Sequence, residues 1–381
     1  MVKESRVVMN IVEPIFWQAR NCPSQVALAA PGTPFSLVSY SRLVIMVTNA
    51  CRRLGSFDLR AGDRVVLKVR DPLFRAILTV ALARLGIIVI PALDGDDTYP
   101  FEVAAVVSDA SHQSSTGRNI LADYNWVAEA GPETGQQNYP AVDPRNLCCV
   151  LADPGEERQA SRRFYALTHD LLDARTARHD VFFGASISAA PRLFDADGCT
   201  TPIGFELLFA TLTRGAALFL MGDPTASFNA LDTFQVESAV MTPQKLLDLV
   251  AFYEAKRDAH CGLKAIFVAG HVSQSMMERA SRILGAKFSV GHYLTQPGMI
   301  ASMPFPGGEA MNNASGIVLP GVTVEVVGDD GRQLETDAPG NIRYRSDLSA
   351  QIYGELRSDS SSFASNRRGY VTRDRLLVLE N

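Results

Sequence analysis

Two groups of side chains in this sequence are of the types that bind metal ions. Asp94, Asp96 and Asp97 form an acidic cluster, and six cysteines are spread along the chain: Cys22, Cys51, Cys148, Cys149, Cys199 and Cys261. The acidic run lacks the later bidentate glutamate that completes a calcium loop, and no cysteines have the CxxC spacing of a zinc site. We therefore predict no metal site, a solvated loop at the aspartates, and buried free thiols in a reducing cytoplasm.

The bulk composition narrows the class of protein further. The chain has 381 residues, of which 47% are hydrophobic and 20% charged, and its net charge is −5, so it is expected to be globular and has no basic field for nucleic acid. The most apolar stretch, 73–93, is interrupted by Arg75, Arg84, Gly86 and Pro91, which argues against a membrane span. The N-terminus has no signal-peptide pattern, and we expect a cytoplasmic protein.

The apolar pattern predicts the elements that must position any functional side chains. A helix is expected over 39–54 with Ser39 as its N-cap, followed by a β-branched strand at 64–69. Asp71 and Pro72 predict the start of a second helix that ends at Gly86, before the buried run 87–93. This order of helix, strand, helix and buried strand indicates a parallel α/β sheet.

The rest of the chain continues this pattern and then changes. Residues 107–145 are poor in apolar side chains and predict a surface excursion, with order near 120–127. Buried strands at 146–152, 215–222 and 263–270 accompany predicted helices, and from about 316 the runs VTVEVV and NIRYR predict an antiparallel hairpin. We expect two packed, mostly parallel βαβ subdomains over 1–315 and a smaller antiparallel β subdomain over 316–381.

The order of several short motifs resembles the ANL superfamily, which comprises acyl- and aryl-CoA synthetases, peptide-synthetase adenylation domains and luciferases. The match runs from about Tyr40 to Arg375 and rests on these segments: SYSRL, LRAGDRVVL, GIIVIPA, LKAIFVAG, GHYLTQ, GIVLPGVTVEVVGDDGRQL with PGNIRYR, and YVTRDR. Each segment is short, but their order over the chain predicts the N-terminal body of that fold. The family's C-terminal lid domain, which carries a catalytic lysine, has no counterpart in this sequence, and no catalytic residue is assigned.

The resemblance implies a nucleotide site, with departures from the family pattern. The segment 152–163 takes the place of the family's phosphate loop, where only Gly155, Ser161 and Arg162 or Arg163 could contact phosphates. Glu156 and Glu157 also lie there, and a carboxylate about 4 Å from a phosphate costs about 1 kcal/mol even in water. We therefore expect weak ATP binding at this loop.

Two further motifs complete the implied nucleotide site. Thr295 corresponds to the family's phosphate-binding threonine, but Gln296 replaces the glutamate that helps to hold Mg²⁺, and a neutral amide is a weak ligand for that ion. Asp374 corresponds to the aspartate that binds the ribose hydroxyls, with Arg373 in place of a tight-turn glycine. The implied cofactor is ATP or AMP, with weak Mg²⁺ binding.

The resemblance also places a substrate pocket. The segment from Asp195 to Phe205 and the residues Phe182, Phe183 and Gly184 match the region that lines the family's carboxylate pocket, and Gly270, His271, His292 and Tyr293 match its mouth. Phe182 and Phe183 could equally be core residues. His271 and His292 could contact a ligand or simply face solvent, and His169 is expected to pack or cap a helix.

These observations favour one function and leave two alternatives. The first is a catalytically impaired adenylate-forming homologue that binds a carboxylic acid or acyl group and acts through a protein partner, such as an active synthetase, a carrier protein or another copy of itself. The second is a true ligase that forms an acyl-adenylate with a C-terminal domain supplied in trans. The third is a structural subunit without a ligand.

Overall fold

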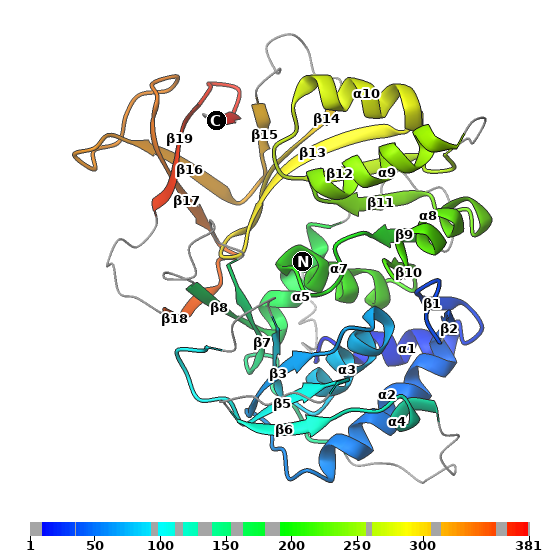
Figure 1. Cartoon of the computed structure of the whole chain (residues 1–381). Helices are drawn as coiled ribbons and strands as arrows, with labels where there is room; N and C mark the ends of the chain where they lie inside the picture. Colours follow the sequence, from blue (N-terminus) through cyan, green and yellow to red (C-terminus); the bar gives the residue numbers. More distant parts are fainter. Residues whose placement is uncertain are drawn as a thin grey trace, which may run out of the picture. The chain divides into compact units, whose positions relative to one another are not determined.

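The chain forms two compact units, each made from more than one segment of sequence. The computed structural model describes residues 10–34, 36–92, 98–110, 117–128, 139–153, 163–179, 191–256, 261–305, 314–355 and 364–379 (Figure 1). The first unit comprises Met1–His179, Gly198–Asp223 and Gln351–Leu356. The second comprises Asp180–Asp197, Pro224–Ala350 and Arg357–Asn381.

The first unit contains a sheet whose described strands run in the order β18-β8-β7-β4-β3-β5-β6. The strands from β7 to β6 pair in parallel, whereas β8 and β18 are added antiparallel at one edge. The bounds are β3 Arg64–Lys68, β4 Ile88–Pro91, β5 Ala105–Ser108, β6 Arg118–Leu121, β7 Leu147–Ala152, β8 Arg163–Thr168 and β18 Gln351–Glu355.

The helices of the first unit begin where the sequence supplies capping side chains. The Ser39 hydroxyl accepts a hydrogen bond from the Arg42 amide, and the Asp71 carboxylate accepts one from the Phe74 amide, directly before Pro72. A second group of strands, β10-β1-β2, belongs to the same unit. The bounds are α1 Glu13–Asn21, β1 Val26–Ala29, β2 Leu37–Ser39, α2 Tyr40–Gly55, α3 Pro72–Arg84, α4 Asn125–Ala128, α5 His169–Ala177, α7 Pro202–Thr213 and β10 Ala217–Leu220.

The second unit starts as a parallel α/β sheet. Strand β11 pairs in parallel with β9 on one side and with β12 on the other, and β12 pairs in parallel with β13. Strands β11 and β12 are almost wholly apolar, as expected for strands covered on both faces. The bounds are β9 Arg192–Asp195, α8 Pro224–Thr233, β11 Ser238–Met241, α9 Pro243–Ala255, β12 Ala265–Ala269, α10 Gln274–Leu284 and β13 Lys287–Leu294.

The same unit then continues as an antiparallel sheet. From β13 onward the neighbours are β14, β15, β20, β19, β17 and β16, all paired antiparallel where their registers are defined. One apolar cluster, which includes Val318, Val322 and Leu377, fills the inside of these strands. The bounds are β14 Gly298–Phe305, β15 Ala314–Val318, β16 Val322–Val327, β17 Gly340–Ser346, β19 Ala364–Val371 and β20 Leu376–Leu379.

The fold confirms the predicted class: mostly parallel α/β layers followed by antiparallel β structure. The helices predicted at 39–54 and after Asp71 are present, and the predicted hairpin is the pair β16–β17. Two details differ. Strand β6 and the end of β5 are parallel sheet strands within the predicted surface excursion. Antiparallel pairing occurs before 316, since it begins at β13–β14 in the second unit and also joins β1 to β2 and β7 to β8 in the first. The domain boundary at 316 stays a prediction. None of the helices in the described ranges combines the length and the apolarity needed to cross a membrane.

Gly291 permits a close contact inside the second unit and provides a test of this packing. A Cβ added at Gly291 would lie 2.2 Å from Cζ of Phe267, a buried ring on β12, so Gly291→Ala is expected to cost about 1–3 kcal/mol of unfolding free energy. Denaturant unfolding measures this cost, and Phe267→Leu should relieve part of it in the double variant. An equal cost in both backgrounds would contradict the contact.

A matched control separates this clash from backbone strain. Gly285 ends α10 in the left-handed conformation with φ 64°, and a Cβ there would meet nothing within 4 Å. Gly285→Ala should therefore cost only the strain of that conformation, about 1 kcal/mol, and Phe267→Leu should leave this cost unchanged.

Candidate functional site

The four parallel strands of the second unit end at one edge, where polar residues gather. The register pairs Met241 of β11 with Val268 of β12, and Ala269 of β12 with Gly291 of β13. The residues that follow are Asp197 after β9, Thr242 after β11 and Gly270 after β12, and the Gly270 amide donates to the Gly291 carbonyl at 3.0 Å. Since ligands of open α/β sheets bind beyond the carboxyl ends of the strands, this edge is the candidate site.

Two aspartates form the acidic part of this edge. Asp195 is 1% exposed, and its Oδ1 accepts a hydrogen bond from the Asp197 amide at 3.1 Å. The Asp197 carboxylate accepts from the Thr242 amide at 2.7 Å and from the Thr242 hydroxyl at 2.8 Å, which ties the end of β9 to the start of α9. Burial raises the pKa of Asp197, and the hydrogen bonds from Thr242 oppose that rise. The Asp197 carboxylate is thus held in place, and a ligand ammonium would complement it, whereas the burial of Asp195 closes that carboxylate to a ligand.

The residues predicted at the mouth of the pocket lie on adjacent strands but in different environments. Gly270 has φ 129°, and a Cβ there would lie 3.3 Å from the ring of Pro243, so a glycine suits this turn. His271 is exposed, and Tyr293 is half-buried. His292 is 5% exposed and its Nε2 lies 3.1 Å from the Tyr344 hydroxyl, which excludes the solvent-facing alternative for this histidine.

The residues predicted to bind the nucleotide also belong to the second unit, except for Arg163. Thr295 is 2% exposed and is the first residue of the turn between β13 and β14, and the Gln296 carbonyl accepts from the Ala350 amide at 2.7 Å. Asp374 is exposed on the turn between β19 and β20, and in the described part of the chain its carboxylate has no hydrogen-bond or ion-pair partner. An available carboxylate suits ribose hydroxyls.

The fit to Mg²⁺ is poor. Gln296 stands where the resemblance requires a carboxylate, its side chain is neutral, and a hard divalent cation prefers charged oxygen ligands. Among the described residues, no three His, Cys, Asp or Glu side chains are grouped to hold a metal ion. No step of a mechanism is therefore assigned to this ion.

The remaining predicted residues lie in the first unit or outside the described ranges. Arg163 begins β8 and is half-buried, and Phe205 is fully buried in α7, where its ring lies 5.4 Å from that of Phe209. The aromatic pair of Phe205 and Phe209 is thus part of the helix packing. The following residues fall outside the described ranges: Asp94, Asp96, Asp97, Gly155, Glu156, Glu157, Ser161, Arg162, Phe182, Phe183 and Gly184.

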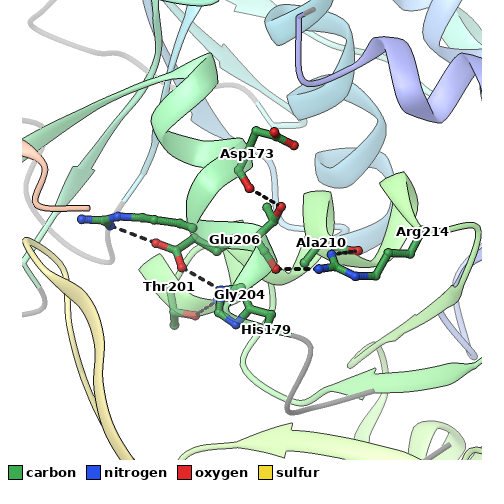
Figure 2. Close-up of polar contacts among 9 residues, drawn as sticks. Asp173, His179, Thr201, Gly204, Glu206, Ala210 and Arg214 are labelled. Carbon is green, nitrogen blue, oxygen red and sulfur yellow. Dashed lines mark hydrogen bonds and ion pairs between the residues drawn. The ribbon is translucent and has the colours of Figure 1, made fainter. Parts of the chain in front are cut away.

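A buried ionic cluster in the first unit was not anticipated from the sequence. Figure 2 shows Glu206 of α7 between two cationic or ionisable groups: Arg175 Nη1 lies 2.9 Å from Oε1, and His179 Nε2 lies 2.8 Å from Oε2. Each of the three side chains is only 1% exposed. The signal was available, because Glu206 is the only charged residue of the otherwise apolar helix PIGFELLFATLT.

This cluster joins two helices and is sealed from solvent. Arg175 comes from the last turn of α5, and Arg214, just beyond α7, donates to the carbonyls of Ala210 at 2.8 Å and Thr176 at 2.9 Å (Figure 2). A ligand in solution cannot reach groups that are 1% exposed. We conclude that the cluster fixes the geometry of α5 against α7 and is not itself a binding site.

A pair of buried cysteines, Cys148 and Cys149 of β7, lies beside this ionic cluster. A register shift between Leu147 and Cys149 marks a bulge at Cys148, and bulges redirect side chains. A hydrogen bond with Cys149 and the neighbouring His169 lower the pKa of the Cys148 thiol to about 5, against the effect of burial. Burial opposes protonation of His169, but Cys148 raises the pKa of that imidazole overall. His169 is fully buried, which confirms the predicted packing role, and both cysteines are free and buried as expected.

The comparisons with known proteins agree on one fold. Residues 199–353 match the model of the AMP-binding enzyme family, and no curated protein sequence matches the chain. A long-chain-fatty-acid-CoA ligase, FadD1 from Archaeoglobus fulgidus, is similar with a TM-score of 0.80 at 14% identity, covering 98% of this chain and 84% of that one. The complex of VinN with L-aspartate has a TM-score of 0.77 at 15% identity, covering 97% and 98%. NpsA-ThdA, an artificially fused adenylation-PCP di-domain from Klebsiella oxytoca, has a TM-score of 0.76 at 14% identity, covering 98% and 79%.

The buried cluster predicts a large effect of removing one charge. Glu206→Gln keeps the shape of the side chain but removes the carboxylate charge that faces the buried Arg175 guanidinium, so we expect a loss of about 3–5 kcal/mol in unfolding free energy. Denaturant unfolding measures it. Glu254→Gln is the control, because the ion pair of Glu254 with Arg279 is at the surface and its loss should change little. A near-neutral Glu206→Gln would show that the cluster is not ionic.

The Cys148 pair predicts a pH-dependent signal. Because the folded protein lowers the pKa of this thiol from its ordinary value of 9.0, the thiolate should contribute ultraviolet absorbance at neutral pH that disappears as the pH falls through about 5. Its contribution to stability is present above the unfolded pKa and is lost as the pH falls through the folded pKa. Cys148→Ser should abolish the signal, whereas Cys149→Ser, which keeps a hydroxyl donor, should retain it. An unchanged absorbance in Cys148→Ser would contradict this assignment.

Proposed function

We propose that the chain is a catalytically impaired relative of the adenylate-forming ANL proteins, and that it binds a small carboxylic acid and acts through a protein partner. This proposal is supported by the match of residues 199–353 to the AMP-binding enzyme family and by the similarity of the fold to a CoA ligase and an adenylation domain. The observation that carries this proposal is the edge where the parallel strands β9, β11 and β12 end beside Gly291 of β13. The edge has rigid backbone, a glycine turn and fixed polar groups, which are the features of a preformed small-molecule site.

The charge at this edge favours an acid that also carries an amino group. Asp197 is held by hydrogen bonds just after β9, so a plain carboxylate that binds there would meet a like charge. An ammonium group on the ligand would instead gain a charge-assisted hydrogen bond. The similarity to a structure of VinN with L-aspartate supports the same class of ligand, an amino acid.

The residues that correspond to the family's metal and phosphate ligands support the proposal that adenylation is impaired. Gln296 offers no charge to Mg²⁺, and Glu156 and Glu157 place like charge in the segment that corresponds to the phosphate loop. Attack of a carboxylate on the α-phosphate of ATP, which forms the acyl-adenylate and releases pyrophosphate, needs the charge of the triphosphate to be neutralised. A chain that keeps an acid-binding edge and weakens the charge-neutralising groups is suited to binding without efficient adenylation.

A protein that binds an acid without converting it would act through a protein partner. The proposed partner is an active synthetase, a carrier protein or a second copy of this chain. Among the matched structures, NpsA-ThdA joins an adenylation domain to a PCP, which supports a carrier protein as the first partner to test.

A genuine ligase is the second candidate, and one observation favours it. The Asp374 carboxylate is exposed and available to ribose hydroxyls. In that case Arg162 or Arg163 and Thr295 would contact the phosphates, Asp374 would hold the ribose, and a C-terminal domain acting in trans would supply the missing cation.

Calorimetry distinguishes the two candidates. We expect the wild type to bind AMP weakly and independently of Mg²⁺, and Asp374→Ala to lose this binding because the ribose contact is removed. An amino acid should bind more tightly than the matching acid without the amino group, by about tenfold for one charge-assisted hydrogen bond. Asp197→Asn should remove this preference.

Two controls make the result decisive. Gln296→Glu restores a carboxylate and should make nucleotide binding depend on Mg²⁺, without a change in melting temperature. ATP–pyrophosphate exchange in the presence of the bound acid reports acyl-adenylate formation directly. Exchange by the wild-type chain would overturn the proposal of impairment and establish the ligase.

A further inference from the structure

A cavity of about 480 Å³ opens in the antiparallel part of the second unit, and its lining contains none of the residues assigned to the carboxylate or the nucleotide. Its apolar floor includes Val318, Val322 and Val371, which belong to the core of these strands or pack against it. Its polar residues include Arg345, Asp347 and Arg375. An apolar floor with a few convergent polar groups is the usual form of a ligand site, and the mouth of a curled sheet is a usual place for one.

The cavity lies along the outer edge of strand β16. Consecutive residues of β16, from Val322 to Val324, line it, although successive side chains of a strand point to opposite faces. A cavity that contacts consecutive residues therefore runs along the backbone. Strand β16 is the last strand in the order of its sheet, so one of its sides has no neighbouring strand in the described residues.

Other parts of the chain already bond to this free side of β16 at Val322 and Val326, which leaves a short opening at Val324 between them. The Val322 carbonyl accepts from Arg375 Nη2 at 3.1 Å, and the Val326 carbonyl accepts from the Leu334 amide at 2.8 Å. Backbone groups of a strand alternate in direction with a period of two, so the amide and carbonyl of Val324 point to the same side as those of Val322 and Val326. In the described part of the chain, Val324 has no backbone partner on that side.

The opening is short, and this limits what can enter it. From Val322 to Val326 the strand rises about 13 Å, at about 3.3 Å per residue. About three residues of an extended chain could lie there and exchange hydrogen bonds with Val324. The ends set by Arg375 and Leu334 exclude a long added strand.

The charges beside the opening are unbalanced. Arg343 and Glu325 face each other across β16 and β17 and form an ion pair at 3.7 Å. Arg345, two residues further along β17, faces Thr323 instead, and no described residue forms a hydrogen bond or ion pair with its side chain. With Arg375 and Asp347, the lining carries two cations and one anion, so it favours one negative charge on a ligand.

We propose that this cavity binds the free C-terminal end of an extended peptide whose last residue is apolar. The peptide backbone would pair with Val324, the apolar side chain would lie on the valines, and the terminal carboxylate would face Arg345. Edge-strand pairing combined with capture of a terminal carboxylate is an established mode of peptide recognition. The lining shares no residue with the carboxylate and nucleotide site proposed above, although Arg375 is the sequence neighbour of Asp374.

The test is a fluorescence-polarisation titration of the full chain with a labelled peptide, Gly-Ser-Ala-Val-Leu, carrying a free carboxylate. The same peptide with a C-terminal amide should bind about tenfold more weakly, since one charge-assisted hydrogen bond is lost. Arg345→Ala should weaken binding of the acid by a similar factor and leave binding of the amide unchanged. A peptide N-methylated at its central amide should also bind more weakly, because it cannot donate to Val324.

Arg343→Ala is the matched control, because Arg343 is on the same strand but pairs with Glu325. It should bind the acid peptide as the wild type does, and both variants should keep the wild-type melting temperature. Equal binding of acid and amide, an equal loss in Arg343→Ala, or no saturable binding would each overturn the proposal. Nucleotide and amino-acid binding are measured separately, so a failure here leaves the proposed function unaffected.

Discussion

Parallel pairing of short, apolar strands is the constraint on which the rest of this structure depends. Parallel strands are joined by crossover helices, so both faces of β11 and β12 are covered and their side chains must be apolar. Polar side chains that could bind a ligand are then accommodated where the strands end. This is why Asp197, Thr242 and Gly270 come within two residues of the ends of three neighbouring strands, although they are far apart in sequence.

The ionic cluster in the first unit is an exception, because it places charged side chains among buried, otherwise apolar elements. Burying Arg175, Glu206 and His179 requires each charge to find its partner inside the protein, and Glu206 does so with both of its oxygens. Two helices that could otherwise slide on an apolar contact are given one defined register by these bonds. The cluster therefore makes the α5–α7 interface more specific in its register than a purely apolar interface would be.

The sequence predicts local features well and three-dimensional partners poorly. Ser39 and Asp71 begin helices because a cap acts on the next turn of the same segment, and such effects are readable from neighbouring residues. The partner of His292 is Tyr344, 52 residues later, and the partner of Glu206 lies on another helix. The sequence predicts order near 120–127 but not the sheet strand β6 at Arg118–Leu121, because a short edge strand with one buried side chain has a weak apolar signal. The candidate edge was placed by resemblance, whereas its hydrogen bonds through Asp197 required the fold.

The turn that carries Asp374 shows how a motif can change without losing its geometry. The sequence places Arg373 where the resemblance expects a glycine, which would imply backbone strain at that residue. In the structure the left-handed residue of the turn is Arg375, with φ 62°, and Arg373 has an ordinary conformation. A left-handed conformation costs a residue with a side chain about 1–2 kcal/mol. The Arg375 guanidinium donates to the carbonyls of Leu319 and Val322, and two such hydrogen bonds, each worth about 1 kcal/mol, offset that cost. The strain is thus placed on a residue whose side chain compensates for it, and Asp374 remains exposed and available.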